Sequence, residues 1–440
     1  MKKILQKFKN SFRALGSRNY RLFFFGQGIS LIGTWMQNIA LAWLIYRLTG
    51  SVFLLGLVGF LSQIMIFVLS PLAGVVSENM NRHKLLILTQ FLSMLQAFVL
   101  AFLVLTHLIQ VWQIILLSTF LGIVVAFDAT VRQSFVIELV EHKQDLSNAI
   151  ALNSSIFQGA RLVGPALAGI IIALYGEGFC FLINGLSFLA VLWTLLQMNL
   201  KRTKPSKSNK PIFKDIKEGF IYAYHFLPIR YLLLFIAFFS LFGMQYVVLM
   251  PAYVQDILHK GPETLGLLMG AAGFGALLGA IYMATRKDVR GLSQIINIGA
   301  IIFSIDLIFV SFVKSFWLVM FIIIISGFSM MLIMASTNTM LQTLVDDDKR
   351  SRIMSFYTMA FLGMAPFGSL IAGSFAHVFK VPLTLLISGC LCLICSLFFW
   401  FNLGKFRSLV RPIYLKMGII QEINQAINMT CELEVECKEK

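Results

Sequence analysis

Acidic residues, and charges in general, are scarce in this chain of 440 residues. Asp and Glu number 20 against 36 Lys and Arg, and charged residues make up 13% of the sequence, whereas soluble domains carry about 25%. Hydrophobic residues make up 58%. A soluble core does not need so much unbroken apolar length, so the composition excludes an ordinary soluble globular protein.

Cysteine, histidine and catalytic motifs are also sparse. Cys390, Cys392 and Cys395 are spaced so that they point in different directions on a helix, and we interpret them as apolar filler instead of a metal site. The six histidines are scattered, and there is no glycine-rich phosphate loop and no hydrolase triad. We therefore expect no metal, no cofactor and no enzymatic activity.

About twelve apolar segments are long enough to cross a bilayer, whose ~30 Å hydrocarbon layer needs ~20 apolar residues per helix. All are predicted to be helices, because a lone strand cannot satisfy its backbone in lipid. The predicted spans are 22–46, 52–76, 85–106, 109–128, 150–174, 178–199, 228–250, 264–284, 293–312, 316–337, 354–377 and 382–403. The predicted divisions are a cytosolic amphipathic N-terminus (1–21), a six-helix bundle (22–200), a basic linker (201–227), a second six-helix bundle (228–403) and a cytosolic tail (404–440) that is solvated or weakly helical.

The basic residues fall almost entirely in alternate gaps between these spans. Of the 36 Lys and Arg, 31 lie on one side of the predicted membrane. This asymmetry is the positive-inside pattern, which places both termini in the cytosol. The net charge of +16 is therefore a topology signal, with the lipid bilayer and its anionic head groups as partner and no nucleic acid.

The two halves of the chain are related by an internal repeat. Gly159, Gly164 and Gly169 in the fifth span recur as Gly363, Gly368 and Gly373 in the eleventh, each displaced by 204 residues. Three glycines at one offset in equivalent spans predict two pseudo-symmetric bundles of six helices, the internal symmetry of many secondary transporters.

Two charged residues, one basic and one acidic, lie deep within predicted spans. Arg161 lies about eleven residues into the fifth span, or ~16 Å deep at ~1.5 Å per residue. Such an arginine must face a cavity or a carboxylate, so it either anchors an anionic or polyhydroxylated substrate or forms a structural ion pair. Asp306 in the ninth span is its acidic counterpart. It is a candidate proton carrier, or else lies near the outer end in contact with water.

A polar stripe follows the first span. At 100° per residue, Gln27, Thr34 and Asn38 fall within ~40° of one another and predict a cavity-lining face, flanked by Gln37. Further polar groups that we expect to bind substrate are Gln158, Gln245 and Tyr246. The alternative is that such a stripe only holds helices together.

The turn after the second span resembles the loop signature of the major facilitator superfamily. Gly74 is followed by Glu78 and then by a basic cluster that begins at Arg82. The spacing suits a close approach of two helices at the glycine and a lock of acid and base at the cytosolic ends. The turn departs from the usual signature in Glu78, where Asp is common, and in Asn81, where a small or acidic residue is common. The alternative is a solvated loop that only enforces orientation.

Asp128 ends the predicted fourth span, and Arg132 lies four residues on, so the two can share a helical face. The superfamily resemblance implies that Asp128 also pairs with the cluster at Arg82. We therefore predict a cytosolic gate latch made of Glu78, Arg82, Asp128 and Arg132, which breaks when the carrier opens inward.

The run from Gly159 through Gly164 and Pro165 to Gly169 resembles the fifth-span motif of exporting members of the superfamily. Small residues let helices approach and proline adds a bend. The alternative is ordinary packing of small residues.

From about Arg18 to Leu403 the chain resembles one branch of the superfamily, the transmembrane secretion effectors related to enterobactin exporters. The stretch ARLVGPALAG is the most specific part. The resemblance implies a bacterial inner-membrane exporter, driven by the proton gradient, for siderophores, drugs or similar small amphipathic molecules, and we expect a monomer. A lipid or lysophospholipid flippase, an importer and a non-transporting sensor or scaffold are the alternatives.

Overall fold

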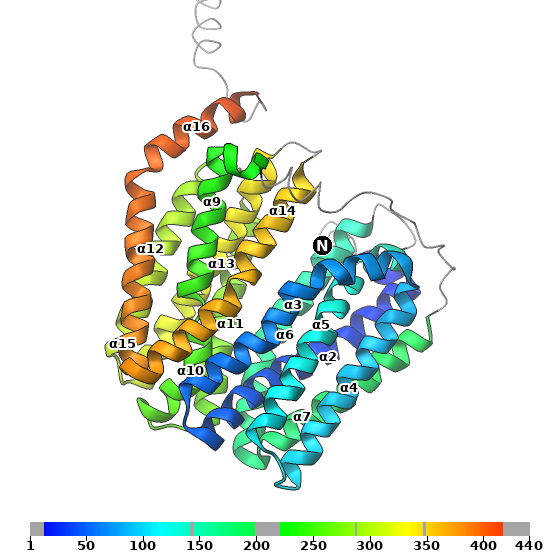
Figure 1. The fold of residues 1–440 in the computed structure, drawn as a ribbon. Helices are drawn as coiled ribbons and strands as arrows, with labels where there is room; N and C mark the ends of the chain where they lie inside the picture. Colours follow the sequence, from blue (N-terminus) through cyan, green and yellow to red (C-terminus); the bar gives the residue numbers. More distant parts are fainter. Residues whose placement is uncertain (1–12, 141–144, 199–220, 287, 346–348, 417–440) are drawn as a thin grey trace, which may run out of the picture.

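The computed structural model describes residues 13–140, 145–198, 221–286, 288–345 and 349–416, and every regular element among them is helical (Figure 1). The first half contains η1 (Arg13–Gly16), α2 (Arg18–Thr49), α3 (Val52–Asn79), α4 (Arg82–Leu105), α5 (Val111–Leu139), α6 (Leu146–Tyr175) and α7 (Glu177–Leu196). The second half contains α9 (Leu227–Phe238), η3 (Phe239–Gly243), α10 (Tyr246–Asp256), α11 (Pro262–Thr285), α12 (Leu292–Phe312), α13 (Phe316–Leu344), α14 (Arg350–Thr358), η4 (Met359–Gly363), α15 (Ala365–Phe401) and α16 (Leu403–Lys416).

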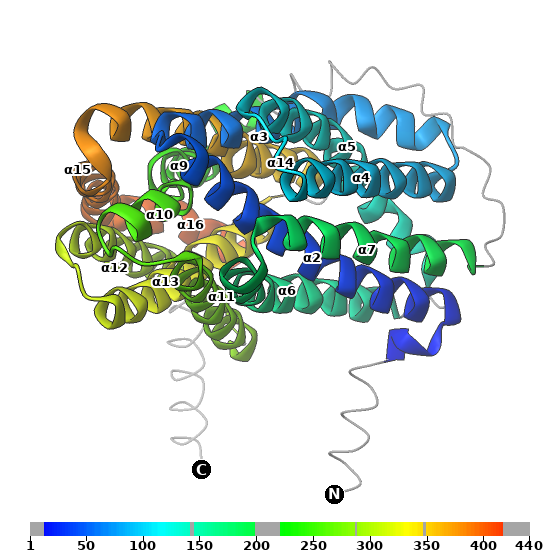
Figure 2. The same cartoon turned by 90° about the horizontal axis from the view of Figure 1, so that it is seen from below.

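Each half forms one bundle, and the two bundles lie side by side (Figures 1 and 2). The linker end of the molecule carries the start of α2, the end of α7, the start of α9 and the helix α16. The far end carries the opposite turns, such as Gly50, which ends α2 in the left-handed conformation, and Ser51, whose side chain caps α3. Most of the predicted linker lies outside the described residues.

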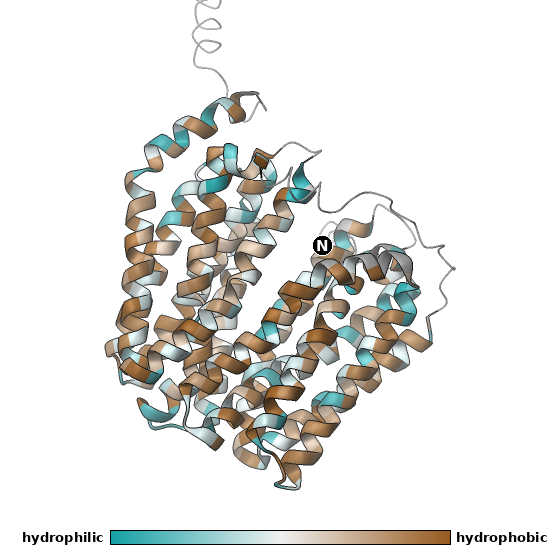
Figure 3. Ribbon diagram, in the orientation of Figure 1, coloured by the Kyte–Doolittle hydropathy of each residue, from teal (hydrophilic) through white to brown (hydrophobic). Residues whose placement is uncertain are grey.

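The lateral surface is apolar, as the bilayer requires. Figure 3 shows hydrophobic residues along most of the helix lengths, and Phe102, Trp193 and Phe401 are among many large apolar side chains exposed there. Eleven helical stretches within the described residues are long and apolar enough to cross a membrane, and the last, Arg352–Phe401, has 50 residues.

That last stretch crosses twice. A straight helix of 50 residues would be about 75 Å long, more than twice the ~30 Å hydrocarbon layer. The chain breaks its helix at Lys380, with φ 62° and ψ 162°, just before Pro382. The predicted all-α fold with twelve crossings in two pseudo-symmetric bundles is therefore confirmed.

The bundles touch through glycine on both sides of the molecule. A Cβ built on Gly266 in α11 would lie 2.8 Å from the Cα of Gly169 in α6, and one built on Gly56 in α3 would lie 2.9 Å from the Cα of Gly373 in α15. Gly169 and Gly373 are one of the pairs predicted from the 204-residue repeat. Because glycine has no side chain, the backbones can meet at both places. The two contacts involve repeated positions and are therefore equivalent under the internal symmetry.

A second repeated pair packs within each bundle. A Cβ on Gly164 would lie 2.6 Å from the Cβ of Trp35 in α2, and one on Gly368 would lie 2.3 Å from the Leu241 carbonyl oxygen in η3. The α2 helix and the α9–η3–α10 helix open their respective halves, so these contacts also correspond. The repeat in the sequence is thus a repeat in packing.

Toward the linker end the bundles separate. Gly363 still lies against the Phe67 ring, 2.5 Å from a Cβ built on the glycine, but a Cβ on its partner Gly159 would meet no described atom within 4 Å. The same holds for a Cβ on Gly74. The close helix approach expected at Gly74 stays a prediction.

Of the two interpretations of the tail, solvated or weakly helical, the structure shows a helix in the first part. Residues 403–416 form α16, which packs on the second bundle with Phe406, Val410 and Tyr414 buried. These residues follow one another at four-residue spacing, and the basic residues Arg407 and Arg411 are exposed. The helix is amphipathic, and the remainder of the tail lies outside the described residues.

Candidate substrate cavity and gates between the bundles

Arg161 lies at the midpoint of α6, where the two bundles face each other. The helix runs from Leu146 to Tyr175, so the arginine is deeper than the predicted span implied. Its guanidinium carbon lies 5.9 Å from the centroid of the Trp35 ring, at the outer limit of a cation–π contact. The Trp35 ring packs edge-on against Phe157 at 5.8 Å. Two aromatic rings thus line one side of the cation.

No carboxylate of the described residues lies within 4.0 Å of the Arg161 guanidinium. The structural ion pair that was the alternative is therefore not formed in this conformation. Pro165, four residues on, has no N–H to offer the Arg161 carbonyl, and a Cβ built on Gly273 of α11 would lie 2.9 Å from that oxygen. The Arg161 backbone lies in the contact between bundles while its charge has no acidic partner.

Tyr246 approaches this cation from the second bundle, and Asp306 lies near Tyr246. Tyr246 is buried at the start of α10, within electrostatic reach of both Arg161 and Asp306. Its ring packs edge-on against Phe303 at 6.0 Å. Asp306 is only 6% exposed and accepts a hydrogen bond from the Ser326 hydroxyl at 3.1 Å. Contact of Asp306 with water at the outer end is therefore not seen.

The polar stripe on α2 faces inward. Gln27, Thr34 and Asn38 lie about 160° around the helix from Phe25 and Ile29, at ~100° per residue, and those two side chains are exposed on the outer surface. Thr34 donates to a carbonyl oxygen one turn earlier, and Asn38 is exposed. The Gln27 side-chain oxygen is buried and, among the described residues, has no hydrogen-bond partner. The stripe therefore offers unused polar groups toward the gap between bundles.

Two other glutamines have different surroundings. Gln37 is 2% exposed, donates to Gln96 at 3.0 Å and accepts from Asn184 at 2.8 Å. Its amide joins α2, α4 and α7, so these hydrogen bonds do not favour the predicted contact of Gln37 with substrate. Gln158 instead reaches across the gap, with its amide nitrogen 3.8 Å from the Met331 sulfur in α13.

The Gln245 side-chain amide is also engaged in hydrogen bonds, among them one to the π-helical turn that precedes it. A π turn leaves backbone carbonyls without their usual partners. The Gln245 amide donates to the Ser240 carbonyl at 2.8 Å, and its oxygen accepts from Ser369 at 3.0 Å. The Ser240 hydroxyl in turn donates to the Phe361 carbonyl in η4. Gln245 therefore joins the two interrupted helices, and its predicted contact with substrate is not supported.

Asp128 and Arg132 form the predicted pair on α5, with an Arg132 nitrogen 3.1 Å from an Asp128 oxygen. The other Asp128 oxygen accepts from Thr89 at 3.0 Å and Gln90 at 2.7 Å, both on α4. Asp128 is buried, and α5 continues to Leu139. Asp128 therefore lies within α5, which continues past the end of the predicted span, as a helical face shared with Arg132 requires.

The superfamily resemblance implied a pair between Arg82 and Asp128, and this pair is not seen. Arg82 lies 2.7 Å from Glu138 at the linker end of α5, an acid that the sequence did not single out. The Glu78 side chain lies outside the described part of the structure. The ion pairs of Arg82, Asp128 and Arg132 all lie within the first bundle. They therefore do not hold the two bundles together in this conformation.

At the far end a hydrogen bond does join the bundles. The Tyr46 hydroxyl, near the end of α2, donates to the Asp256 carboxylate at the end of α10 over 2.5 Å. Beside it, Arg47 and Glu177 form a salt bridge of 2.7 Å within the first bundle. Tyrosine at a membrane interface is common, so nothing in the sequence pointed to this contact. The molecule is closed at the far end and parted at the linker end.

The sequence model of the transmembrane secretion effector family matches residues 9–411. The chain belongs to this family. The protein is therefore a multi-pass membrane transporter of small molecules and not an enzyme, and the resemblance noted in its sequence is confirmed.

The matches to curated relatives extend over most of this chain. The chain is 25% identical to the Staphyloferrin A transporter of Staphylococcus aureus over 392 residues, which is 88% of this chain and 97% of that one. It is 22% identical to the multidrug efflux pump Tap of Mycolicibacterium fortuitum over 369 residues, 80% of this chain and 88% of the other.

Solved structures agree in fold. A bacterial homologue of the iron transporter ferroportin superimposes with a TM-score of 0.66 and 17% identity, covering 89% of this chain and 99% of its own. A bacterial homologue of the lysosomal transporter Spinster gives 0.67 and 13%, covering 89% and 98%.

Removing the Tyr46 hydroxyl should weaken the contact between the two bundles at the far end of the protein. A hydrogen bond to a charged group contributes about 1.5–3 kcal/mol, so Tyr46→Phe should shift the ratio of far-end-closed to far-end-open molecules about 10- to 100-fold. Spin labels at His107 and Lys314, in far-end turns of the two bundles, measure this as a longer distance. Tyr175→Phe, an exposed far-end tyrosine, is the control. An unchanged distance distribution in Tyr46→Phe would show that the contact does not hold the bundles.

Proposed function

We propose that this protein is a secondary active exporter of small amphipathic molecules that carry anionic or polyhydroxylated groups, siderophores and drugs among them. The observation that carries the proposal is the unpaired guanidinium of Arg161 at mid-membrane. A cation without an acid is costly there unless it meets water or a ligand. The relatives named for staphyloferrin A transport and multidrug efflux support this substrate class, and the efflux pump supports the outward direction.

The binding site would lie between the bundles. Arg161 would hold the anionic group of the substrate, with Trp35 and Phe157 against its apolar part. Gln27, Thr34 and Asn38 from α2, Gln158 from α6 and Tyr246 from the second bundle would supply hydrogen bonds. Contributions from both bundles let a bound substrate favour their closure around it.

Transport would proceed by alternating access. The contacts at the far end and the separation near Gly159 correspond to a carrier open at the linker end. We place that end in the cytosol and the protein in a bacterial inner membrane as a monomer, because basic residues collect around the linker-end turns. Substrate would then enter from the cytosol or the inner leaflet and leave at the far end.

Asp306 would carry the proton that returns the empty carrier. Its charge alone does not enforce exchange, because an anion on Arg161 favours a protonated Asp306 and so favours joint binding. Antiport therefore requires that Asp306 take up its proton from the far side while the site is empty and release it to the cytosol before substrate binds. Its burial in the far-end-closed molecule, with Ser326 as hydrogen-bond donor, is compatible with that order.

Asp306→Asn should abolish proton-driven export and leave downhill substrate exchange intact, because asparagine keeps the hydrogen bond and cannot titrate. Everted vesicles with an acidic lumen should accumulate a siderophore with the wild type and not with the variant. Asp288→Asn, an exposed acid outside the spans, is the control. Accumulation by Asp306→Asn would exclude Asp306 as the carrier.

The wild type decides the direction. Substrate loss from vesicles with an acidic lumen would indicate symport and overturn the exporter proposal. Transport that survives complete collapse of the gradient would remove the proton coupling. Movement of labelled lipid without export of a soluble substrate would indicate a flippase.

A further inference from the structure

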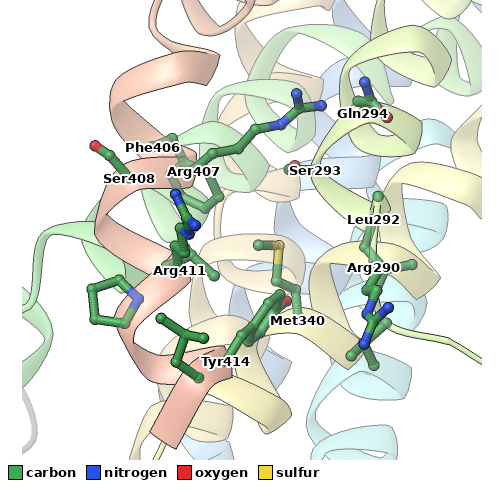
Figure 4. A pocket seen from close by; sticks show the side chains of 15 residues that line it. Arg290, Leu292, Ser293, Gln294, Met340, Phe406, Arg407, Ser408, Arg411 and Tyr414 are labelled. Carbon is green, nitrogen blue, oxygen red and sulfur yellow. The ribbon is translucent and has the colours of Figure 1, made fainter. Parts of the chain in front are cut away.

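A second pocket lies at the linker end, away from Arg161. It has a volume of about 710 Å³ and is enclosed by α16 on one side and by the start of α12 and the linker end of α13 on the other. Figure 4 shows Arg407 and Arg411 on the α16 side, Arg290 and Gln294 on the opposite side, and Tyr414 next to Met340 between them. None of its lining residues was assigned a role above.

The walls of this pocket are suited to an anion. Arg290, Arg407 and Arg411 line it, and Asp288, 3.4 Å from Arg290, is the acid beside them. The 21-residue helix α12 begins in its wall at Leu292, and the residue before it, Gly291, supplies no side-chain cap. The first backbone N–H groups of a helix favour negative charge and bind phosphate.

The Tyr414 hydroxyl is an independent sign of a missing ligand. Tyr414 is only 6% exposed, and its oxygen is buried with no hydrogen-bond partner among the described residues. A buried hydroxyl without a partner costs free energy. Burial, and secondarily the charge of Asp288, raise the pKa of this phenol, so it remains a neutral donor. Figure 4 shows its oxygen at the pocket, beside Met340.

We propose that this pocket binds a phosphate group, held by Arg407 and Arg411 of α16, the first turn of α12 and the Tyr414 hydroxyl. The amphipathic α16 follows the last membrane span, so the pocket lies at the level of lipid head groups. The phosphate would belong either to an anionic phospholipid or to a small soluble phosphate. Its occupancy would fasten α16 to α12 and α13.

The test uses the full-length protein in a neutral detergent with two probes, short-chain phosphatidylglycerol and inorganic phosphate. Arg411→Gln should weaken binding about tenfold or more, and Tyr414→Phe several-fold, because each removes a donor to an anion. Lys405→Gln is the matched control, since it removes one charge from the same helix without lining the pocket. Melting without ligand establishes that each variant is folded.

The two probes separate the sources of the phosphate. Binding of phosphatidylglycerol alone, with the expected order of losses, identifies a lipid head group. Binding of inorganic phosphate with the same order identifies a soluble phosphate. If neither probe binds, or if Lys405→Gln weakens binding as much as Arg411→Gln, the proposal is wrong.

Discussion

Replacing Arg161 by glutamine should reduce export of an anionic substrate about 30- to 1,000-fold. Loss of one partner from a buried, hydrogen-bonded charge pair costs about 2–4 kcal/mol, and no neighbouring cation of the described structure stands beside Trp35 to replace it. Initial export rates and direct binding of the substrate to purified protein measure the loss. Both should fall together, because the anchor acts in binding.

Three further variants locate the effect. Arg161→Lys keeps the charge without the planar fork and should retain part of the binding. Arg21→Gln removes an exposed basic residue near the linker end and should leave export unchanged. Trp35→Leu should weaken binding of aromatic substrates more than that of small anions. Full export by Arg161→Gln would show that the arginine is structural.

A bulky residue at Gly266 should force the carrier open at the far end. A Cβ there would lie 2.5 Å from the Pro165 carbonyl oxygen in the closed contact, so Gly266→Val clashes in this conformation and not in one with the far ends apart. Overpacking costs about 1–3 kcal/mol, which shifts the ratio of the two states about 5- to 150-fold. The spin-label distance between His107 and Lys314 should lengthen, and net transport should fall.

The internal symmetry supplies the controls for this experiment. Gly56→Val on α3 should act in the same direction, because a Cβ there would lie 2.4 Å from the Ser369 carbonyl oxygen. Gly270→Ala, one turn along α11 from Gly266, would place its Cβ at 3.3 Å from the Leu162 carbonyl oxygen and should have a small effect. Equal effects of Gly266→Val and Gly270→Ala would exclude the clash as the cause.

The paired glycines show how much of the fold is predictable. The period and length of the apolar segments predict helices, and the repeat relating Gly169 to Gly373 predicts that they pack in equivalent places. Both follow from the primary structure because a bilayer admits few architectures. The charges at alternate gaps predict orientation for the same reason.

The residues predicted for the substrate site differ in where the structure places them. Arg161, Tyr246, Gln158 and the α2 stripe lie at or near the gap between the bundles, whereas Gln37 and Gln245 are engaged with other helices. An embedded arginine must face something polar, so its position is informative by itself. A glutamine in lipid-spanning helices satisfies its amide with whatever lies near, and that choice depends on neighbours distant in sequence.

Residue types and spacing were thus sufficient for the number of membrane crossings, the twofold repeat and the importance of one buried cation. Packing alone decided the partners of individual polar groups, Glu138 for Arg82 and Asp256 for Tyr46. It also decided that the helix α16 lies against α9, α12 and α15. The physical reason is the distance over which each interaction acts. Hydrophobic burial acts on every residue of a segment at once and can be summed along the chain, whereas hydrogen bonds and ion pairs depend on a few ångströms between residues up to 210 positions apart.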